Sequence, residues 1–148
     1  MKRWRFTSVF VLVLSAFYLY AFPSASIFYF GIVVLHSGVG VLFAAGLMLF
    51  LVRGIAQESW IARIGWIALA AGTVLGLLLI YLGTPHRLKN WLYAHIVLCT
   101  LGVLLLALAW LAERARLGHG FPRKILAFAA LMVVTAGVCA GAWWLREV

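Results

Sequence analysis

Long apolar runs, separated by short polar segments, make up almost the whole chain. The segment from Asn90 to Ala112 contains no charged residue, and its length matches the roughly 20 apolar residues that a helix needs to cross a bilayer. Just before it, Thr84 can cap a helix and Pro85 suits the first helical turn, so we expect the helix to begin there. The same pattern predicts five membrane-spanning helices, at approximately residues 5–22, 27–52, 60–82, 85–112 and 124–145.

The first of these runs follows the basic start MKRWR and has two interpretations. A basic start before an apolar run is found both in signal peptides and in first membrane spans. This run is rich in aromatic residues, and small residues suited to cleavage appear only around Ser24 to Ser26. We therefore expect the segment to be retained as the first span.

The distribution of Lys and Arg predicts the orientation of the helices. If the N-terminus lies inside, nine basic residues fall on the cytoplasmic side and three fall outside. This asymmetry predicts an N-in, C-out topology. Because the loops are short, we expect helices two to five to form an up-and-down four-helix bundle.

Composition supports an all-α integral membrane protein and excludes several other classes. Hydrophobic residues make up 67% of the 148 residues and charged residues only 10%, against about 25% charged in soluble domains. There is no Asp and there are only three Glu, so a hydrolase with paired carboxylates is excluded and we expect no catalytic residue. The net charge of +9 reports membrane topology, and we expect no nucleic acid as a partner.

Two histidines inside apolar runs are the main candidates for chemistry. His36 and His95 lie on the second and fourth predicted helices, where ionisable groups are costly and therefore candidates for function. Arg53 follows His36 by 17 residues, and Glu113 follows His95 by 18. At ~1.5 Å per residue, each imidazole would lie about 26 Å from its inner charge, at a common depth in the outer part of the membrane.

Bundle topology gives these histidines a possible common ligand. The second and fourth helices are parallel and diagonal in an up-and-down bundle, which leaves room between them for a flat cofactor. Two facing imidazoles suit the iron of haem b, so we expect one haem with His36 and His95 as axial ligands. Zinc would need further protein ligands that this half of the membrane lacks.

Other residues are candidates for contacts with that haem. Gly40, Gly76 and Gly137 would leave bare backbone beside a macrocycle, although the motifs GTVLG and GVCAG are also typical of ordinary helix packing. Arg87 and Lys89 lie above His95 and would pair with the propionates, or instead contact lipid headgroups.

The remaining histidines and the cysteines have simpler interpretations. We expect His86 to be a loop residue, although it is the first substitute ligand if His36 does not bind, and His119 to be exposed. Cys99 and Cys139 form no C-x-x-C pair, so they fit small packing residues better than a disulfide or a covalent haem attachment.

A second interpretation of His36 and His95 needs no cofactor. Each imidazole would then form a hydrogen bond with a Ser, a Thr or a backbone carbonyl of a neighbouring helix, and polar side chains link membrane helices in this way. Four hydroxyl residues in the apolar runs are available as partners: Ser37, Thr73, Thr100 and Thr135.

With His36 and His95 on two helices of a bundle, the chain resembles the small helical membrane-embedded b-type cytochrome subunits. The resemblance lies in the pattern of spans and histidines, and the second histidine pair of the di-haem members is missing. It implies electron transfer between the quinone pool and an outer-face partner such as a c-type cytochrome, within an oxidoreductase complex of the bacterial inner membrane. The alternatives are a cofactor-free structural subunit of a larger complex and, less well supported, a small transporter, because no charge or proline interrupts helices two to five at mid-depth.

Overall fold

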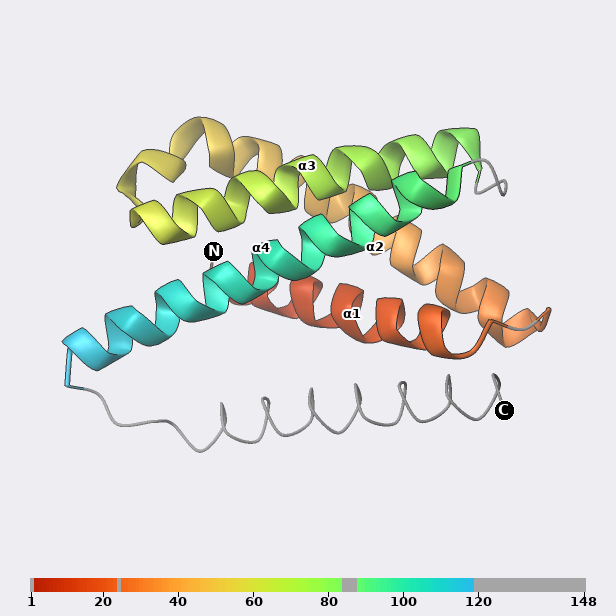
Figure 1. Cartoon of the computed structure of the whole chain (residues 1–148), viewed down its shortest axis with the longest axis horizontal. Coiled ribbons are helices and arrows are strands. Elements are labelled where there is room, and N and C mark those ends of the chain that lie inside the picture. The colour runs from red at the N-terminus through yellow and green to blue at the C-terminus, as the bar shows by residue number, and fades with distance from the viewer. Residues whose placement is uncertain (1, 24, 84–87, 119–148) are drawn as a thin grey trace. The chain divides into compact units, whose positions relative to one another are not determined.

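A computed structural model describes residues 2–23, 25–83 and 88–118. These residues form four α-helices and one short 3₁₀ helix, and no β-strand occurs among them. In chain order the elements are α1 (Lys2–Ala21), α2 (Ile27–Arg53), η1 (Ile55–Gln57), α3 (Trp60–Leu82) and α4 (Lys89–Arg116) (Figure 1). The all-helical class is confirmed, whereas the predicted fifth helix lies outside the described residues, so the five-span count and the bundle topology stay predictions.

Three of the helices are long and apolar enough to cross a membrane. Helices α2, α3 and α4 have 27, 23 and 28 residues. At ~1.5 Å per residue even α3 is about 35 Å long, which exceeds the ~30 Å hydrocarbon core of a bilayer. The apolar part of α1, Thr7–Ala21, is shorter. The chain is therefore an integral membrane protein.

Local chemistry explains where α3 begins and ends. Ser59 has extended backbone and its hydroxyl accepts a hydrogen bond from the N–H of Ala62 at 3.3 Å, so it is the N-cap. At the other end Gly83 has φ = 74°, a conformation that glycine adopts without steric cost. The predicted range of residues 60–82 is confirmed.

The boundaries of α4 differ from the prediction. The helix begins at Lys89, later than the expected start at Pro85, and residues 84–87 lie outside the described part of the chain. It ends at Arg116, four residues beyond Ala112. The extension places Arg114 and Arg116 in the last turn, where cations interact favourably with the helix dipole, so charge does not end this helix.

The described helices belong to two compact units. One contains α1 and the first part of α2, up to Val39, and the other contains the rest of α2, from Gly40, with η1, α3 and α4. In the first unit the ring of Tyr18 packs edge-on against Phe28 at 5.3 Å between centroids, which joins α1 to α2. The aromatic contact lies near the ends of the two helices that the chain connects.

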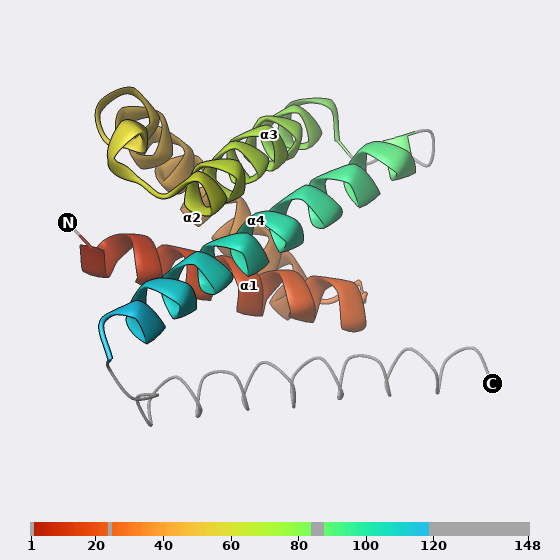
Figure 2. The same ribbon diagram turned by 60° about the vertical axis from the view of Figure 1, so that its left-hand side comes forward.

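In the second unit α3 and α4 pack as an antiparallel pair (Figure 2). Glycines allow the close approach: a Cβ on Gly65 would lie 3.1 Å from the carbonyl oxygen of Gly102, and a Cβ on Gly102 would lie 2.7 Å from Leu69 Cγ. Small residues at helix contacts are typical of membrane proteins, where close backbone packing replaces the hydrophobic effect.

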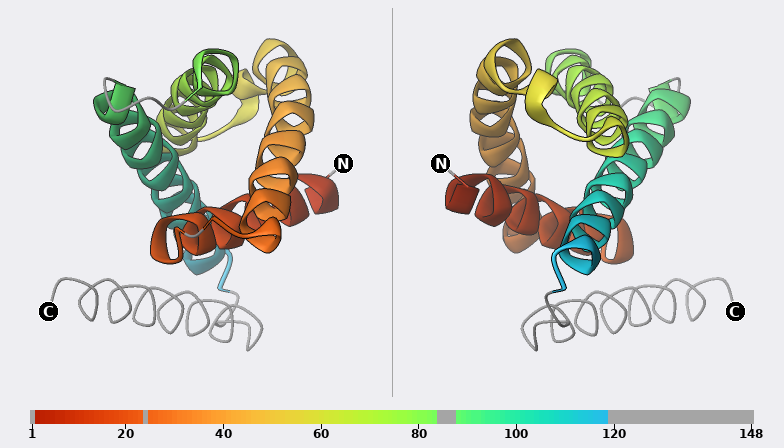
Figure 3. Two further views of the ribbon diagram at one scale, coloured as in Figure 1. Left: turned by 90° about the vertical axis from the view of Figure 1, so that its right-hand side faces the viewer. Right: turned by 90° about the vertical axis from the view of Figure 1, so that its left-hand side faces the viewer.

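The short helix η1 connects the second half of α2 with α3 (Figure 3). Phe50 packs on Trp66 with 4.8 Å between ring centroids. The guanidinium of Arg63 donates to the carbonyls of Ala56 at 2.6 Å and of Glu58 at 2.9 Å. These bonds satisfy carbonyl groups of the turn and hold the start of α3 against it.

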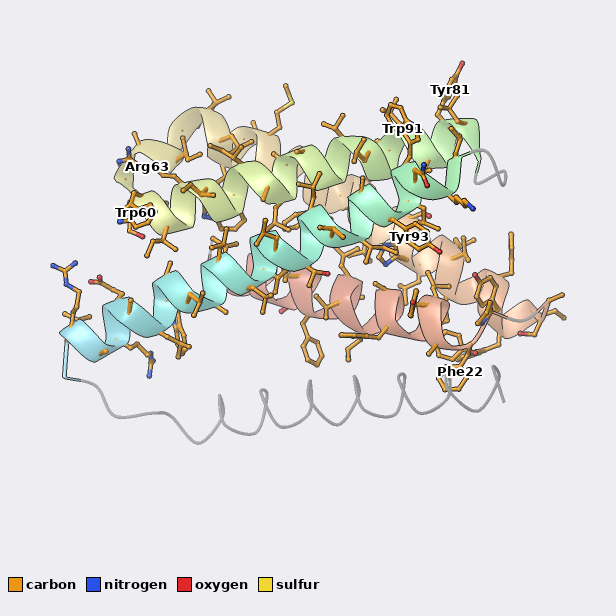
Figure 4. All side chains as sticks on the ribbon, in the orientation of Figure 1. Phe22, Trp60, Arg63, Tyr81, Trp91 and Tyr93 are labelled. Atoms are coloured by element: carbon orange, nitrogen blue, oxygen red, sulfur yellow. The ribbon has the colours of Figure 1, made fainter. Side chains whose placement is uncertain are left out.

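Aromatic side chains mark both ends of the α3–α4 pair (Figure 4). Tyr81 and Trp91 lie where α3 ends and α4 begins, and Trp60 lies with Arg63 at the opposite end. The side chains of Tyr81 and Trp60 are 87% and 71% exposed. Tyr and Trp favour the two membrane–water interfaces, so this spacing fits a helix pair that crosses the bilayer.

Candidate functional site

His95 is a half-buried residue of α4 that is held against α3. Its Nδ1 lies 2.7 Å from the carbonyl oxygen of Gly72. A backbone carbonyl only accepts hydrogen bonds, so Nδ1 carries the proton and donates it. In the neutral imidazole the lone pair is then on Nε2, which is the atom available to bind a metal.

Gly76 makes room for this imidazole. A Cβ on Gly76 would lie 2.8 Å from Cε1 of His95 and 3.1 Å from its Nδ1. Any larger residue would displace the ring and lengthen the hydrogen bond to Gly72. In the structure the ring of His95 lies against the backbone of Gly76. The expected role of Gly76 beside a macrocycle stays a prediction.

Cys99 lies one turn after His95 and packs on the same part of α3. A Cβ on Gly72 would lie 2.6 Å from Sγ of Cys99, and Sγ lies 3.8 Å from Nδ1 of His95. The thiol therefore fills the gap beside Gly72, which confirms the predicted packing role of this cysteine. Gly72 and Gly76 also confirm the alternative interpretation of GTVLG as a helix-packing motif.

His36 is a half-buried residue of α2 that is held against α1. Its Nδ1 lies 2.8 Å from Oγ of Ser15. Oγ of Ser15 also lies 2.7 Å from the carbonyl oxygen of Val11 and 3.0 Å from that of Leu12. A hydroxyl has one proton, and these short distances to carbonyl oxygens require it there. Ser15 therefore accepts from Nδ1–H of His36, and the lone pair is again on Nε2.

Both histidines thus have the same tautomer, fixed by a bond to a neighbouring helix. Histidines that bind metals almost always donate their second ring N–H to a carbonyl, a carboxylate or water, which fixes the ring and raises the basicity of the ligand nitrogen. The same bonds also match the cofactor-free interpretation, in which each imidazole links two helices. The partners are of the predicted kinds, a Ser and a backbone carbonyl of a neighbouring helix. Among the hydroxyl residues named as available, Thr73 instead donates to Leu69 of its own helix.

The remaining candidate residues are placed as follows. Gly40 lies one turn after His36 and is half-buried. Lys89 is the exposed first residue of α4, six residues before His95, or about 9 Å along the helix axis. The candidate residues of the sequence analysis that lie outside the described part of the chain are His86, Arg87, His119, Thr135, Gly137 and Cys139.

Zinc and haem would need different numbers of protein ligands. Within residues 2–23, 25–83 and 88–118 no group of three or more His, Cys, Asp or Glu side chains could hold a metal. Structural zinc takes four protein ligands, whereas haem brings four nitrogens and needs only axial ligands. His36 and His95 belong to different compact units, so their meeting around one iron stays a prediction.

Sequence reasoning missed the two groups that orient the rings. Ser15 is a hydroxyl residue inside the apolar run of α1, which is itself a signal, but that helix was placed outside the four-helix bundle. The carbonyl of Gly72 could not be identified from the sequence, because every residue has a backbone carbonyl.

No protein-family model, curated protein or solved structure matches this chain. Its function is therefore inferred from its own residues and geometry.

Proposed function

We propose that this protein is a haem b subunit of a membrane electron-transfer complex, with His36 and His95 as the axial ligands of a single haem. The observation that carries the proposal is the shared state of the two imidazoles. Each donates Nδ1–H to a neighbouring helix, at 2.8 Å to Ser15 and at 2.7 Å to Gly72, and each has its lone pair on Nε2. In histidines that bind metals, the second ring N–H is usually donated in this way, which fixes the tautomer and the orientation of the ring.

The energetics of a membrane interior support a role for both residues. An ionisable side chain inside a membrane helix is costly, and such residues usually take part in function. In this chain two of them occupy long apolar helices, and each is fixed in one orientation. A bound haem would supply a one-electron Fe³⁺/Fe²⁺ couple, while the protein would supply ligands, orientation and an apolar surrounding that tunes the potential.

The proposed partners follow from the predicted topology and from the resemblance to b-type cytochrome subunits. Electrons would pass between the quinone pool and a redox protein at the outer face, such as a c-type cytochrome, in a bacterial inner membrane. Lys89, exposed at the start of α4, is one cation that would face haem propionates, and Arg87 is the predicted second one. The long apolar helices place the subunit in the lipid bilayer, where it would dock to other membrane or periplasmic subunits.

The second candidate is a cofactor-free structural subunit. The observation that favours it is that each imidazole forms a hydrogen bond that links two helices. In this case the histidines would stabilise α1 against α2 and α4 against α3, each bond contributing about 0.6 kcal/mol, as measured for polar links between membrane helices.

An absorption spectrum of the purified full-length protein separates the two candidates. Under the first, reduced-minus-oxidised haem bands are present and disappear in His36→Ala and in His95→Ala, because each substitution removes an axial ligand. His119→Ala is the control and leaves the bands unchanged. A colourless wild-type protein that assembles normally, after expression with ample haem, would overturn the electron-transfer proposal in favour of the structural one.

A further inference from the structure

Ser15 of α1 is a buried polar side chain to which the proposed function has so far given no role. It is only 6% exposed, although it lies in the apolar part of α1, Thr7–Ala21, where the aromatic side chain of Tyr20 is exposed. Its Oγ contacts three groups: the carbonyls of Val11 and Leu12 on its own helix, and Nδ1 of His36 on α2. A buried serine costs free energy of folding unless its hydroxyl forms hydrogen bonds, because burial removes the hydroxyl from water.

The three contacts form a directed chain of hydrogen bonds. Ser15 donates its only proton toward the carbonyl of Val11 at 2.7 Å, so its oxygen lone pairs face His36. The imidazole donates Nδ1–H to that oxygen at 2.8 Å. Because a hydroxyl that donates is polarised, it becomes a stronger acceptor for the next bond. The chain therefore runs from His36 through Ser15 into the backbone of α1.

We propose that Ser15 is the positioning residue of His36, and that it sets the reduction potential of the haem that His36 binds. The inference rests on the haem function proposed above. Ser15 holds Nδ1–H, keeps Nε2 as the ligand atom and increases the electron density on the ring. It follows that α1 is part of the cofactor site, although its sequence shows only a first span.

The size of the effect follows from what such hydrogen bonds do at other metal sites. Loss of a partner that orients a histidine ligand typically lowers metal affinity or activity 10–100-fold. A more basic imidazole stabilises the ferric state more than the ferrous state. If Ser15→Ala lowers that preference tenfold, the midpoint potential rises by about 59 mV, the value for a tenfold change in a one-electron couple.

Three variants of the full-length protein test this inference. Ser15→Ala removes the acceptor, and Ser15→Thr keeps a hydroxyl that can bond the same backbone carbonyl. Ser8→Ala removes a hydroxyl two turns earlier on the same helix and is the matched control. We expect Ser15→Ala to retain less haem than wild type and the haem that it retains to have a higher midpoint potential. Ser15→Thr and Ser8→Ala should stay close to wild type in both measurements.

A second readout does not depend on haem. Nitrogen-15 magnetic resonance of protein labelled at histidine reports which ring nitrogen carries the proton, and the His36 signals are those lost in His36→Ala. We expect protonated Nδ1 at His36 in the wild type and a mixture of tautomers in Ser15→Ala, with the His95 signals unchanged.

The outcomes separate this inference from the function on which it rests. An unchanged His36 tautomer in Ser15→Ala would overturn the positioning role. A changed tautomer with an unchanged potential would overturn the role in setting the potential. If the wild-type protein binds no haem while Ser15→Ala still changes the tautomer, the positioning of His36 by Ser15 is supported and the haem function is overturned.

Discussion

The two candidate ligands reach the same tautomer by different means. His95 of α4 donates to a backbone carbonyl of α3, whereas His36 of α2 donates to a side-chain hydroxyl of α1. A carbonyl survives every side-chain substitution, so the His95 site is disrupted only by a change in how α3 and α4 pack. A hydroxyl is lost with a single substitution, so a change at Ser15 removes this acceptor of His36.

The helix packing near His95 also differs from that on the helix that carries His36. Next to His95, glycines of α3 bring the helices so close that added Cβ atoms would collide with the ring of His95 and with Sγ of Cys99. On the α2 helix that carries His36, a Cβ added at Gly31 or Gly38 meets no atom of the described residues within 4 Å. The ring of His95 thus lies in a close helix contact as well as in a hydrogen bond, and a described contact of the His36 ring is its hydrogen bond with Ser15.

The strongest test of this difference is Gly102→Val. The valine Cβ would lie 2.7 Å from Leu69 Cγ and 2.9 Å from the carbonyl oxygen of Gly65, so α3 and α4 must separate. Overpacking of this kind typically costs about 1–3 kcal/mol, and more when the obstacle is backbone. We expect a lower thermal unfolding midpoint in detergent together with loss of the Nδ1–H signal of His95.

Gly38→Val is the control for that substitution, because a Cβ added at Gly38 meets none of the described residues within 4 Å. It should change the unfolding midpoint only slightly. Equal destabilisation by the two variants would contradict a special role for the α3–α4 contact.

The next test is Gly76→Ala, which acts on one ring. The alanine methyl would lie 2.8 Å from Cε1 of His95, so the imidazole must rotate away from the carbonyl of Gly72. If the haem proposal is correct, haem retention should fall 10–100-fold, because a ligand loses its orientation. Haem content per purified protein measures this effect, with Gly31→Ala as the matched substitution at a position with open space.

The smallest expected effect is that of Cys99→Ser. The thiol lies 3.8 Å from Nδ1 of His95, and the main acceptor is Gly72, so a serine of similar size changes little. We expect the unfolding midpoint and the His95 tautomer to stay near wild type. A large shift in either would mean that the thiol, and not the carbonyl, orients His95.

The hydrophobic pattern predicted the membrane helices because their lengths follow from bilayer thickness, which acts on each segment separately. The range of α3 was correct at both ends, where Ser59 and Gly83 are local signals. The end of α4 was placed too early because charged residues were taken to end a helix, although Arg114 and Arg116 are accommodated in its last turn.

The candidate site could be predicted only in part. His36 and His95 stand out in the sequence because ionisable residues are rare in apolar runs. Gly76 was selected as well, as a residue beside a macrocycle, and the sequence did not show that the ring of His95 lies against it. Ser15 and the carbonyl of Gly72 were not found, because the sequence does not show which surfaces of two helices face each other.

The sequence by itself determined that this is a helical membrane protein with two histidines inside its apolar segments. Hydropathy and local capping chemistry act over a single helix, so they can be read along the chain. Only the tertiary structure decided which nitrogen of each imidazole carries the proton. That choice depends on the acceptor across the helix contact, and the contact is made by residues 21 and 23 positions away in the sequence.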